Sequence, residues 1–191
     1  MSFLVDTSTG TDNDYMNVVL AYVTSLDGFL TNSAGQEAAI WASPEDQKQF
    51  KELARECGVV VIGTNTYVSH KASLVPENGL LRIVMTREPE KYDKELVSGS
   101  LEFSSLSPQE LVKKISSGGR RKILLAGGPK LYGEFFKEKI VTELHVTLEP
   151  VLFGAGLAAG SGIPSDVALQ LMDSVQLNAN GTLLLRYKVL Y

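Results

Sequence analysis

Three short, largely apolar runs in this chain are each followed at once by glycine or by a hydroxyl residue. They are VVVI before GTNTY, RIVM before TR, and KILLA before GGPKLY, beginning at residues 59, 82 and 122. The fully apolar run VVVI is typical of a parallel strand covered on both faces. In such sheets, ligands bind at the carboxyl ends of the strands, where helix starts offer backbone N–H groups to phosphates. We therefore expect an α/β fold with a ligand site built from the segments after these runs.

Two helix starts lie between the predicted strands. Residues 43–46 and 107–110 each place serine at the N-cap, proline at the first helical position and an acid three residues after the serine. Apolar residues from Phe50 to Cys57 follow the first start at the spacing of one buried helical stripe. We expect Gly58 to end this helix.

The last third of the chain changes character. Residues 143–153 predict one long strand, and the apolar runs 169–177 and 182–190 flank the sequence NANG. This arrangement is typical of a β-hairpin. The expected fold is a mixed, mostly parallel sheet with helices on both faces and a C-terminal antiparallel hairpin.

Composition limits the classes of function. The chain has 191 residues, 44% of them hydrophobic, and a net charge of −4, which fits one domain over residues 16–191 behind a polar, mobile arm at 1–15. A single cysteine and two histidines exclude a disulfide framework and the usual zinc sites, so no metal is expected. Without a basic run, a secretory signal or a membrane-spanning stretch, we expect a cytoplasmic protein with no nucleic-acid or membrane partner.

One glycine-rich segment requires a separate interpretation. Residues 154–160, GAGLAAG, follow a predicted strand and are similar to a dinucleotide-binding fingerprint. That motif needs a following helix and a further βαβ unit, whereas the sequence SGIP comes next. We therefore interpret the segment as a loop.

Six segments taken together resemble the dihydrofolate reductase-like superfamily: AYVTSLDGFL, SPEDQKQFKEL, VVVIGTNTY, RIVMTR, LLAGGPKLY and ELHVTLEPVLFGAG. The chain is most similar to the reductase domain at the C-terminus of the bifunctional riboflavin-biosynthesis deaminase-reductase, from about residue 17 onward. The resemblance implies an NADPH-dependent reductase of the 5-amino-6-(5-phosphoribosylamino)uracil type, acting on a pyrimidine or pteridine-like substrate. The alternatives are a dihydrofolate reductase and a non-catalytic NADPH-binding protein.

The resemblance also implies a cofactor site. Contacts to the pyrophosphate and nicotinamide ribose of NADPH are expected from Gly63, Thr64, Thr66, Gly127, Gly128, Lys130, Leu131 and Tyr132. Thr86 and Arg87 would bind the adenosine 2′-phosphate, which favours NADPH over NADH. Residues expected to flank the nicotinamide are Ala21, Leu30 and Thr31.

Asp46 is the expected catalytic residue. Its spacing from Phe50 and Lys51 matches the helix on which dihydrofolate reductases carry the acid that binds the pteridine and assists protonation. As the third residue of its helix, Asp46 is alternatively part of a capping box, and the two roles are compatible. The expected substrate-binding residues are Asp27, Trp41, Phe50 and Lys51. Alternatively, Asp27 is a turn residue, Trp41 and Phe50 belong to the core, and Lys51 is a solvent-exposed charge on the helix.

Two further features bear on the substrate and on assembly. The riboflavin branch usually carries an Asp-Asn-Pro-x-Leu segment for the ribose phosphate, where this chain has YVSHKASL at residues 67–74. The closing hairpin is more apolar than an exposed edge should be. Because riboflavin-type reductase domains commonly pair through this part of the fold, we predict a homodimer with the C-terminal strands near the interface.

Overall fold

The computed structural model describes residues 16–191, so the arm expected at residues 1–15 lies outside the described residues. The strands are β1 (Asn17–Ser25), β2 (Val59–Gly63), β3 (Leu81–Met85), β4 (Leu101–Ser104), β5 (Lys122–Leu125), β6 (Glu143–Glu149), β7 (Ala168–Gln176) and β8 (Leu183–Leu190). The helices are α1 (Ala38–Trp41), α2 (Pro44–Cys57), α3 (Thr64–His70), α4 (Pro108–Ser117) and α5 (Pro129–Lys137). None of the helices in this described part is long and apolar enough to cross a membrane.

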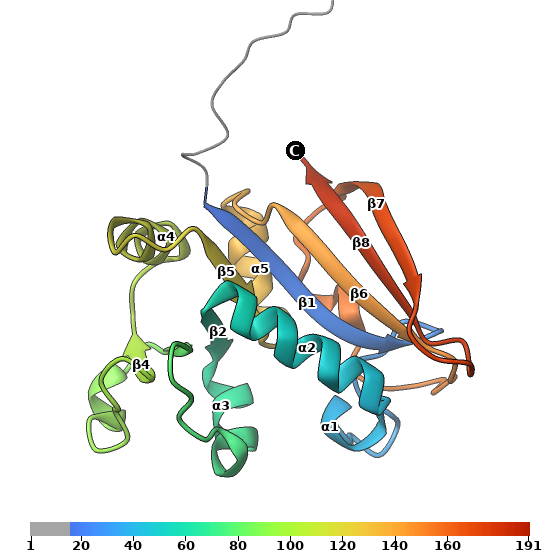
Figure 1. Ribbon diagram of the computed structural model, residues 1–191, viewed down its shortest axis with the longest axis horizontal. Helices are drawn as coiled ribbons and strands as arrows, with labels where there is room; N and C mark the ends of the chain where they lie inside the picture. The colour runs from blue at the N-terminus through green and yellow to red at the C-terminus, as the bar shows by residue number, and fades with distance from the viewer. Residues whose placement is uncertain (1–15) are drawn as a thin grey trace, which may run out of the picture.

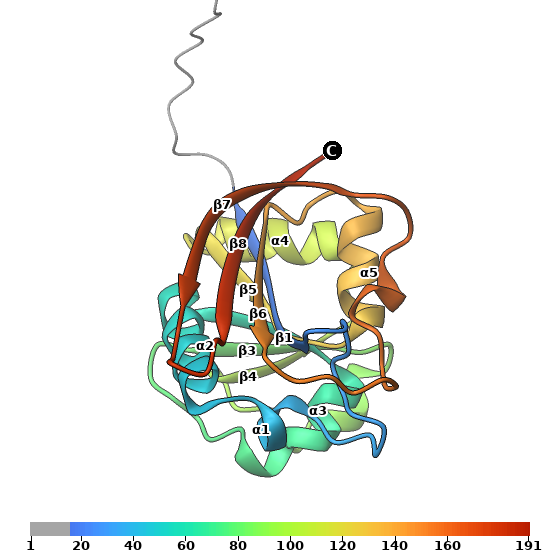
Figure 2. The same cartoon turned by 90° about the vertical axis from the view of Figure 1, so that its right-hand side faces the viewer.

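All eight strands form one sheet in the order β4-β3-β2-β5-β1-β6-β8-β7 (Figure 1). The strands from β4 to β6 pair in parallel, and β8 pairs antiparallel with both β6 and β7. This is the mixed, mostly parallel sheet with a closing hairpin that the sequence predicts. Figure 2 shows β7 as the outermost strand on the side that faces the viewer.

The two faces of the sheet carry separate cores, because side chains alternate along each strand. In β1, Val18 and Leu20 belong to the cluster that α4 and α5 cover, and Val19 belongs to the cluster under α2 and α3. In Figure 1, α2 lies in front of the sheet and α5 behind it. The central strand β2 contributes to both clusters, which explains its continuous apolar sequence.

Both predicted helix starts are confirmed. The Ser43 side chain accepts a hydrogen bond from the Asp46 N–H at the start of α2, and Gly58 ends this helix in the left-handed conformation at φ 66°. Ser107 caps α4 in the same way, and there Glu110 closes a full capping box. The local sequence therefore determines where these helices begin.

The predicted strand over residues 143–153 is too long. β6 ends at Glu149, because Pro150 has no N–H for the sheet ladder. The Val151 N–H donates to the Glu149 carbonyl at 2.8 Å, which turns the chain away. The short edge strand β4 and the helix α3 are further elements that the sequence patterns did not predict.

The glycine-rich segment 154–160 leads into the short 3-10 turn η3 (Ala159–Gly162) and not into an α-helix, as predicted. Gly156 in this segment and Gly162 at the end of η3 allow close packing. A Cβ at Gly156 would lie 1.9 Å from the Thr31 carbonyl oxygen, and one at Gly162 would lie 1.8 Å from the Pro129 carbonyl oxygen. The segment therefore packs tightly against the start of α5 and the loop after β1.

Candidate active site

A cavity of about 1680 Å³ opens along the carboxyl ends of the parallel strands and extends beneath α2. Its walls include the ends of β2 and β3, the segment after β5, and the first turns of α3 and α5. All the expected cofactor residues line it: Ala21, Leu30, Thr31, Gly63, Thr64, Thr66, Thr86, Arg87, Gly127, Gly128, Lys130, Leu131 and Tyr132. Asp46, Phe50 and Lys51 line it as well.

One wall is a glycine cradle between β2 and β5. A Cβ at Gly127 would lie 2.8 Å from the Gly63 nitrogen and 2.8 Å from the Leu131 Cδ2 atom, so only glycine fits there. A Cβ at Gly128 would meet nothing within 4 Å. Gly128 is also the N-cap of α5, whose start has no side-chain cap. Backbone N–H groups that face a cavity at the start of a helix, with no side chain over them, are suited to binding the diphosphate of a dinucleotide.

A second wall lies at the end of β3. The Thr64 hydroxyl donates to the Met85 carbonyl oxygen at 3.1 Å, which ties the start of α3 to this strand. Thr86 and Arg87 follow at once, and Arg87 is exposed. Within residues 16–191, the Arg87 guanidinium has no ion-pair or hydrogen-bond partner, so its donors remain available to an anion.

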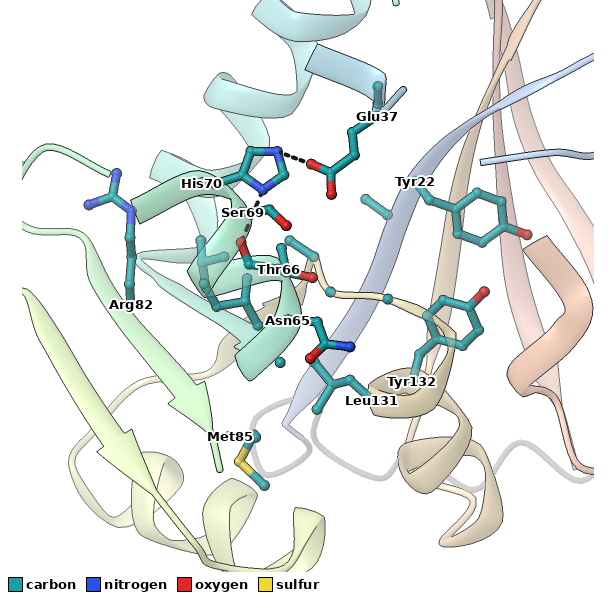
Figure 3. A pocket seen from close by; sticks show the side chains of 18 of the residues that line it. Tyr22, Glu37, Asn65, Thr66, Ser69, His70, Arg82, Met85, Leu131 and Tyr132 are labelled. Carbon is teal, nitrogen blue, oxygen red and sulfur yellow. Dashed lines mark hydrogen bonds and ion pairs between the residues drawn. The ribbon is translucent and has the colours of Figure 1, made fainter. Parts of the chain in front are cut away.

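A side-chain contact between α3 and the segment before α1 lines the cavity (Figure 3). The His70 Nε2 atom on α3 lies 2.9 Å from the Glu37 Oε2 atom, just before α1. The other ring nitrogen, Nδ1, lies 3.0 Å from the Thr66 carbonyl oxygen. On the opposite side, Tyr22 and Tyr132 stack with ring centroids 6.1 Å apart. The first contact connects α3 to the segment before α1, and the stacked tyrosines connect β1 to α5.

Asp46 lies deep in the cavity, with only 8% of its surface exposed. Burial raises the pKa of its carboxyl group. A hydrogen bond from the Thr147 hydroxyl on β6 opposes this shift, and the nearby negative charge of Glu149 adds to it. A buried carboxyl group with a raised pKa is suited to binding N–H donors and to taking up a proton.

The capping-box interpretation of Asp46 is only half correct. Its backbone N–H does donate to the Ser43 hydroxyl at 3.2 Å. The Ser43 N–H, however, donates to Glu149 Oε1 at 2.8 Å instead of to Asp46. A carboxylate from β6 thus completes the cap, and the Asp46 side chain turns into the cavity. In α4, Glu110 performs both halves itself.

Family membership is decided by the length of the sequence match. The profile of the RibD C-terminal domain family matches residues 16–183. The chain belongs to the RibD C-terminal domain family. The resemblance noted in the sequence is therefore confirmed for most of the chain.

Three relatives show how this family member compares with named proteins. The chain is 24% identical over 163 residues to the uncharacterized protein YwjB of Bacillus subtilis, covering 83% of this chain and 90% of that one. It is 21% identical to the 2,5-diamino-6-ribosylamino-4(3H)-pyrimidinone 5′-phosphate reductase of Methanothermobacter thermautotrophicus. This match covers 84% of this chain and 89% of that protein. It is 24% identical to the riboflavin biosynthesis protein RibD of Mycobacterium tuberculosis, covering 75% of this chain but only 44% of that one.

Solved structures agree on the fold. A putative riboflavin biosynthesis protein from Shewanella superposes with a TM-score of 0.74 at 17% identity, covering 92% of this chain and 100% of that one. Dihydrofolate reductase from Enterococcus faecalis superposes with a TM-score of 0.61 at 17% identity, covering 91% of this chain and 96% of that one. The RibD C-terminal domain family member described here therefore has the dihydrofolate reductase-like fold.

Two expected substrate residues lie outside the cavity lining. The Asp27 carboxylate accepts hydrogen bonds from the Ser25 hydroxyl at 2.6 Å and from the Gly154 N–H at 2.7 Å. These bonds hold the pKa of Asp27 below its ordinary value. Trp41 packs edge-on against Phe153, with ring centroids 4.9 Å apart. Both residues thus anchor the loop that follows β6.

Two polar residues on β6, His145 and Thr147, line the cavity, and the sequence analysis did not single them out. Every second residue of the strand is polar, namely Glu143, His145, Thr147 and Glu149. Between them, Leu144, Val146 and Leu148 pack into the core on the α5 side. His145 and Thr147 line the cavity under α2. The strict alternation in ELHVTLE was the available signal, because one face of a buried strand is seldom polar throughout.

Proposed function

We propose that this protein is an NADPH-dependent reductase of the riboflavin-pathway type, formed by a single domain over residues 16–191. Its substrate would be a small pyrimidine or pteridine-like molecule. The observation that carries the proposal is that the buried Asp46 carboxyl group and the glycine cradle at Gly127 line one cavity. Membership of the RibD C-terminal domain family and the similarity to the Methanothermobacter reductase support it.

The residues present fit a phosphorylated nicotinamide dinucleotide. Gly127 and Gly128 allow a diphosphate to approach the backbone at the start of α5. Arg87, exposed beside Thr86, would form a charge-assisted pair with a 2′-phosphate. Bound NADPH would supply a hydride. The protein would position the substrate, supply a proton and exclude water from the cavity.

The role proposed for Asp46 follows from its surroundings. A carboxylate accepts hydrogen bonds from ring N–H and amino groups, so Asp46 would orient the heterocycle in the cavity. Its raised pKa would let it hold a proton that the reduced substrate then takes up. Apolar neighbours such as Phe50 and Leu53, which also line the cavity, would limit water. Holding the reacting atoms close together would supply much of the rate acceleration.

The assignment is tested by following NADPH oxidation with two substrates in parallel. These are 5-amino-6-(5-phosphoribosylamino)uracil and 2,5-diamino-6-ribosylamino-4(3H)-pyrimidinone 5′-phosphate, and dihydrofolate serves as the comparison. We expect turnover with at least one of the two riboflavin-type substrates and little with dihydrofolate. Turnover with dihydrofolate alone would assign a dihydrofolate reductase. Tight NADPH binding without any turnover would indicate a non-catalytic binding protein.

Replacing Arg87 with alanine is expected to weaken NADPH binding by about 1.5–3 kcal/mol, the range for a lost charge-assisted hydrogen bond. NADH lacks the 2′-phosphate, so its affinity should hardly change. Fluorescence titration of wild-type and Arg87→Ala protein with both cofactors measures the two dissociation constants. An equal weakening of NADPH and NADH would contradict the assignment of Arg87 to the 2′-phosphate.

We also propose that the protein forms a homodimer through its C-terminal strands. All nine residues of the edge strand β7 are exposed, including Leu171 at 54% and Met172 at 56%. An apolar exposed edge favours pairing with a second copy. Light scattering after size exclusion should give twice the chain mass at micromolar concentration, and Leu171→Lys should give the monomer mass. A wild-type peak at the monomer mass would contradict the proposal.

A further inference from the structure

Glu149 is a buried acid at the end of β6 that does not line the cavity. The residue is only 5% exposed. Its Oε1 atom accepts a hydrogen bond from the Ser43 N–H at 2.8 Å, and its Oε2 atom accepts one from the Thr182 hydroxyl at 2.7 Å. Removing a carboxylate from water costs free energy unless donors satisfy it, and here each oxygen has a donor. Glu149 therefore connects the start of α2 to the residue before β8.

The turn of the C-terminal hairpin fixes the direction of these hydrogen bonds. The Asn178 Oδ1 atom accepts from the backbone N–H groups of Asn180 at 3.1 Å and of Thr182 at 3.2 Å. The Asn178 amide nitrogen therefore donates, and Thr182 Oγ1 accepts from it at 2.9 Å. Because the Thr182 hydroxyl accepts from Asn178, its own hydrogen is left to donate to Glu149. Glu149 thus faces donors on both oxygens, which is the arrangement that suits an ionised carboxylate.

The start of α4 shows the alternative arrangement for the same motif. There Glu110 accepts a hydrogen bond from the Ser107 N–H at 2.9 Å and closes a capping box. In α2 the equivalent N–H, that of Ser43, donates to Glu149. Asp46, at the position equivalent to Glu110, lines the cavity instead. An acid from β6 thus occupies the place that the helix's own acid takes in α4.

Glu149 also acts on Asp46 through its charge. Burial is the main cause that raises the pKa of the Asp46 carboxyl group, the hydrogen bond from Thr147 opposes it, and the negative charge of Glu149 adds to it. Like charges close together disfavour ionisation. Titratable side chains on β6, on α2 and before α1 also line the cavity, namely His145, Lys51 and Glu37. Among the described residues, Glu149 is the charged one that contributes to the pKa shift at Asp46.

We propose that Glu149 is a positioning residue for Asp46: it takes the cap of α2 in place of the Asp46 side chain and holds a second carboxylate beside it. This inference rests on the proposed function, in which Asp46 binds the heterocycle. Without the charge of Glu149, Asp46 should lose its proton at a lower pH. Without the acceptor that Glu149 provides, the Asp46 side chain should turn back to the Ser43 N–H, as Glu110 does in α4, and leave the cavity.

The test is a pH titration of the Asp46 carboxyl carbon by NMR on ¹³C-aspartate-labelled protein without ligand. The Asp46 signal is the one missing from spectra of the Asp46→Asn protein. Glu149→Gln removes the charge and keeps an acceptor for the Ser43 N–H, so the titration midpoint should move to lower pH. Glu149→Ala removes both. Asp46 should then turn to the cap and its midpoint should move lower still, because a hydrogen bond to the charged form favours that form.

Glu45→Gln is the matched control. Glu45 lies beside Asp46 at the same helix start and accepts from the Asn178 amide at 3.1 Å, but it is exposed. Water and salt screen an exposed charge, so its removal should leave the Asp46 midpoint unchanged. Circular dichroism shows whether each variant is folded, and Glu149→Gln decides the case if Glu149→Ala does not fold. An Asp46 midpoint that stays in place in Glu149→Gln, or that Glu45→Gln moves as far, overturns the inference.

Kinetics give a readout that a purely structural role would not move. The pH profile of kcat/KM reports groups of the free enzyme, so the limb that follows Asp46 should move to lower pH in Glu149→Gln together with the NMR midpoint. At its own optimum pH, Glu149→Gln should stay within about threefold of wild type, and Glu149→Ala should lose roughly 10- to 100-fold, part of the contribution of a positioned acid.

The outcomes separate this inference from the proposed function. If NADPH is oxidised and the Asp46 midpoint is the same in wild type and Glu149→Gln, the reductase assignment stands and the inference fails. If the midpoint moves as expected and neither riboflavin-type substrate is turned over, Glu149 positions Asp46 and the reductase assignment fails. A folded Glu149→Ala protein whose midpoint is not below that of Glu149→Gln overturns the exchange at the cap.

Discussion

Replacing Asp46 with asparagine is expected to lower kcat/KM roughly 10²- to 10⁴-fold, the usual contribution of a positioned acid. The same change should stabilise the ligand-free protein at pH 7 to 8. Burial raises the pKa of Asp46 in the folded state, so the folded protein binds its proton more tightly than the unfolded chain does. Stability is therefore lost as pH rises through the folded pKa, and asparagine removes this loss. Melting temperatures at pH 4 and pH 8 measure the difference, which should shrink at the lower pH.

Glu110 provides a matched control because it occupies the equivalent position in α4. Its hydrogen bonds with Ser107 hold its pKa below the ordinary value, so its charge stabilises the folded state above the unfolded pKa and that contribution is lost in acid. Glu110→Gln should lower the melting temperature at pH 7 and leave turnover unchanged. An Asp46→Asn protein that is fully active, or that is destabilised at pH 8 as Glu110→Gln is, would contradict the role given to Asp46.

Adding one methyl group at Gly127 is expected to destabilise the fold by about 1–3 kcal/mol and to abolish tight cofactor binding. The new Cβ would lie 2.8 Å from the Gly63 nitrogen and 3.2 Å from the Ile62 Cα atom. Both are backbone atoms of β2, so β2 and the segment after β5 would have to separate. Denaturant unfolding and a cofactor titration measure the two effects.

Gly128→Ala is the neighbouring control. Its Cβ would meet nothing within 4 Å, and the backbone conformation at φ −62° suits any residue. Stability should therefore stay within about 0.5 kcal/mol of wild type, as for other substitutions away from close contacts. Cofactor affinity should still fall, because the methyl group would project into the cavity. Equal destabilisation by both substitutions would contradict the packing described for the cradle.

The sheet and the cofactor wall could be predicted because their signals are local. Each apolar strand is followed at once by the small residues of the cavity, as at Gly63 and Gly127. A parallel sheet brings the carboxyl ends of its strands to one edge, so these segments had to meet. Helix starts at Ser43 and Ser107 depend on neighbouring residues, and both were found where the pattern indicated.

The substrate wall could not be predicted from such patterns because its contacts join distant parts of the chain. Ser43 and Glu149 are 106 positions apart, and their hydrogen bond takes the capping role that Glu110 has in α4, while Asp46 lines the cavity. Likewise, Asp27 binds Gly154 across 127 positions, which takes its carboxylate away from the cavity. The same motif, serine followed by an acid three residues later, therefore forms a full capping box in α4. In α2 the acid, Asp46, lines the cavity instead.

The most direct measurement of the proposed reaction follows the hydrogen that is transferred. The protein is incubated with a riboflavin-type pyrimidine substrate and NADPH deuterated at the transferred position of nicotinamide C4, and the pyrimidine product is analysed by mass spectrometry. A hydride-transferring reductase predicts one deuterium in the reduced pyrimidine, none with unlabelled NADPH, and almost none from the Asp46→Asn protein in the same time. NADPH consumed at the same rate without the pyrimidine, or a product without deuterium, would contradict the assignment.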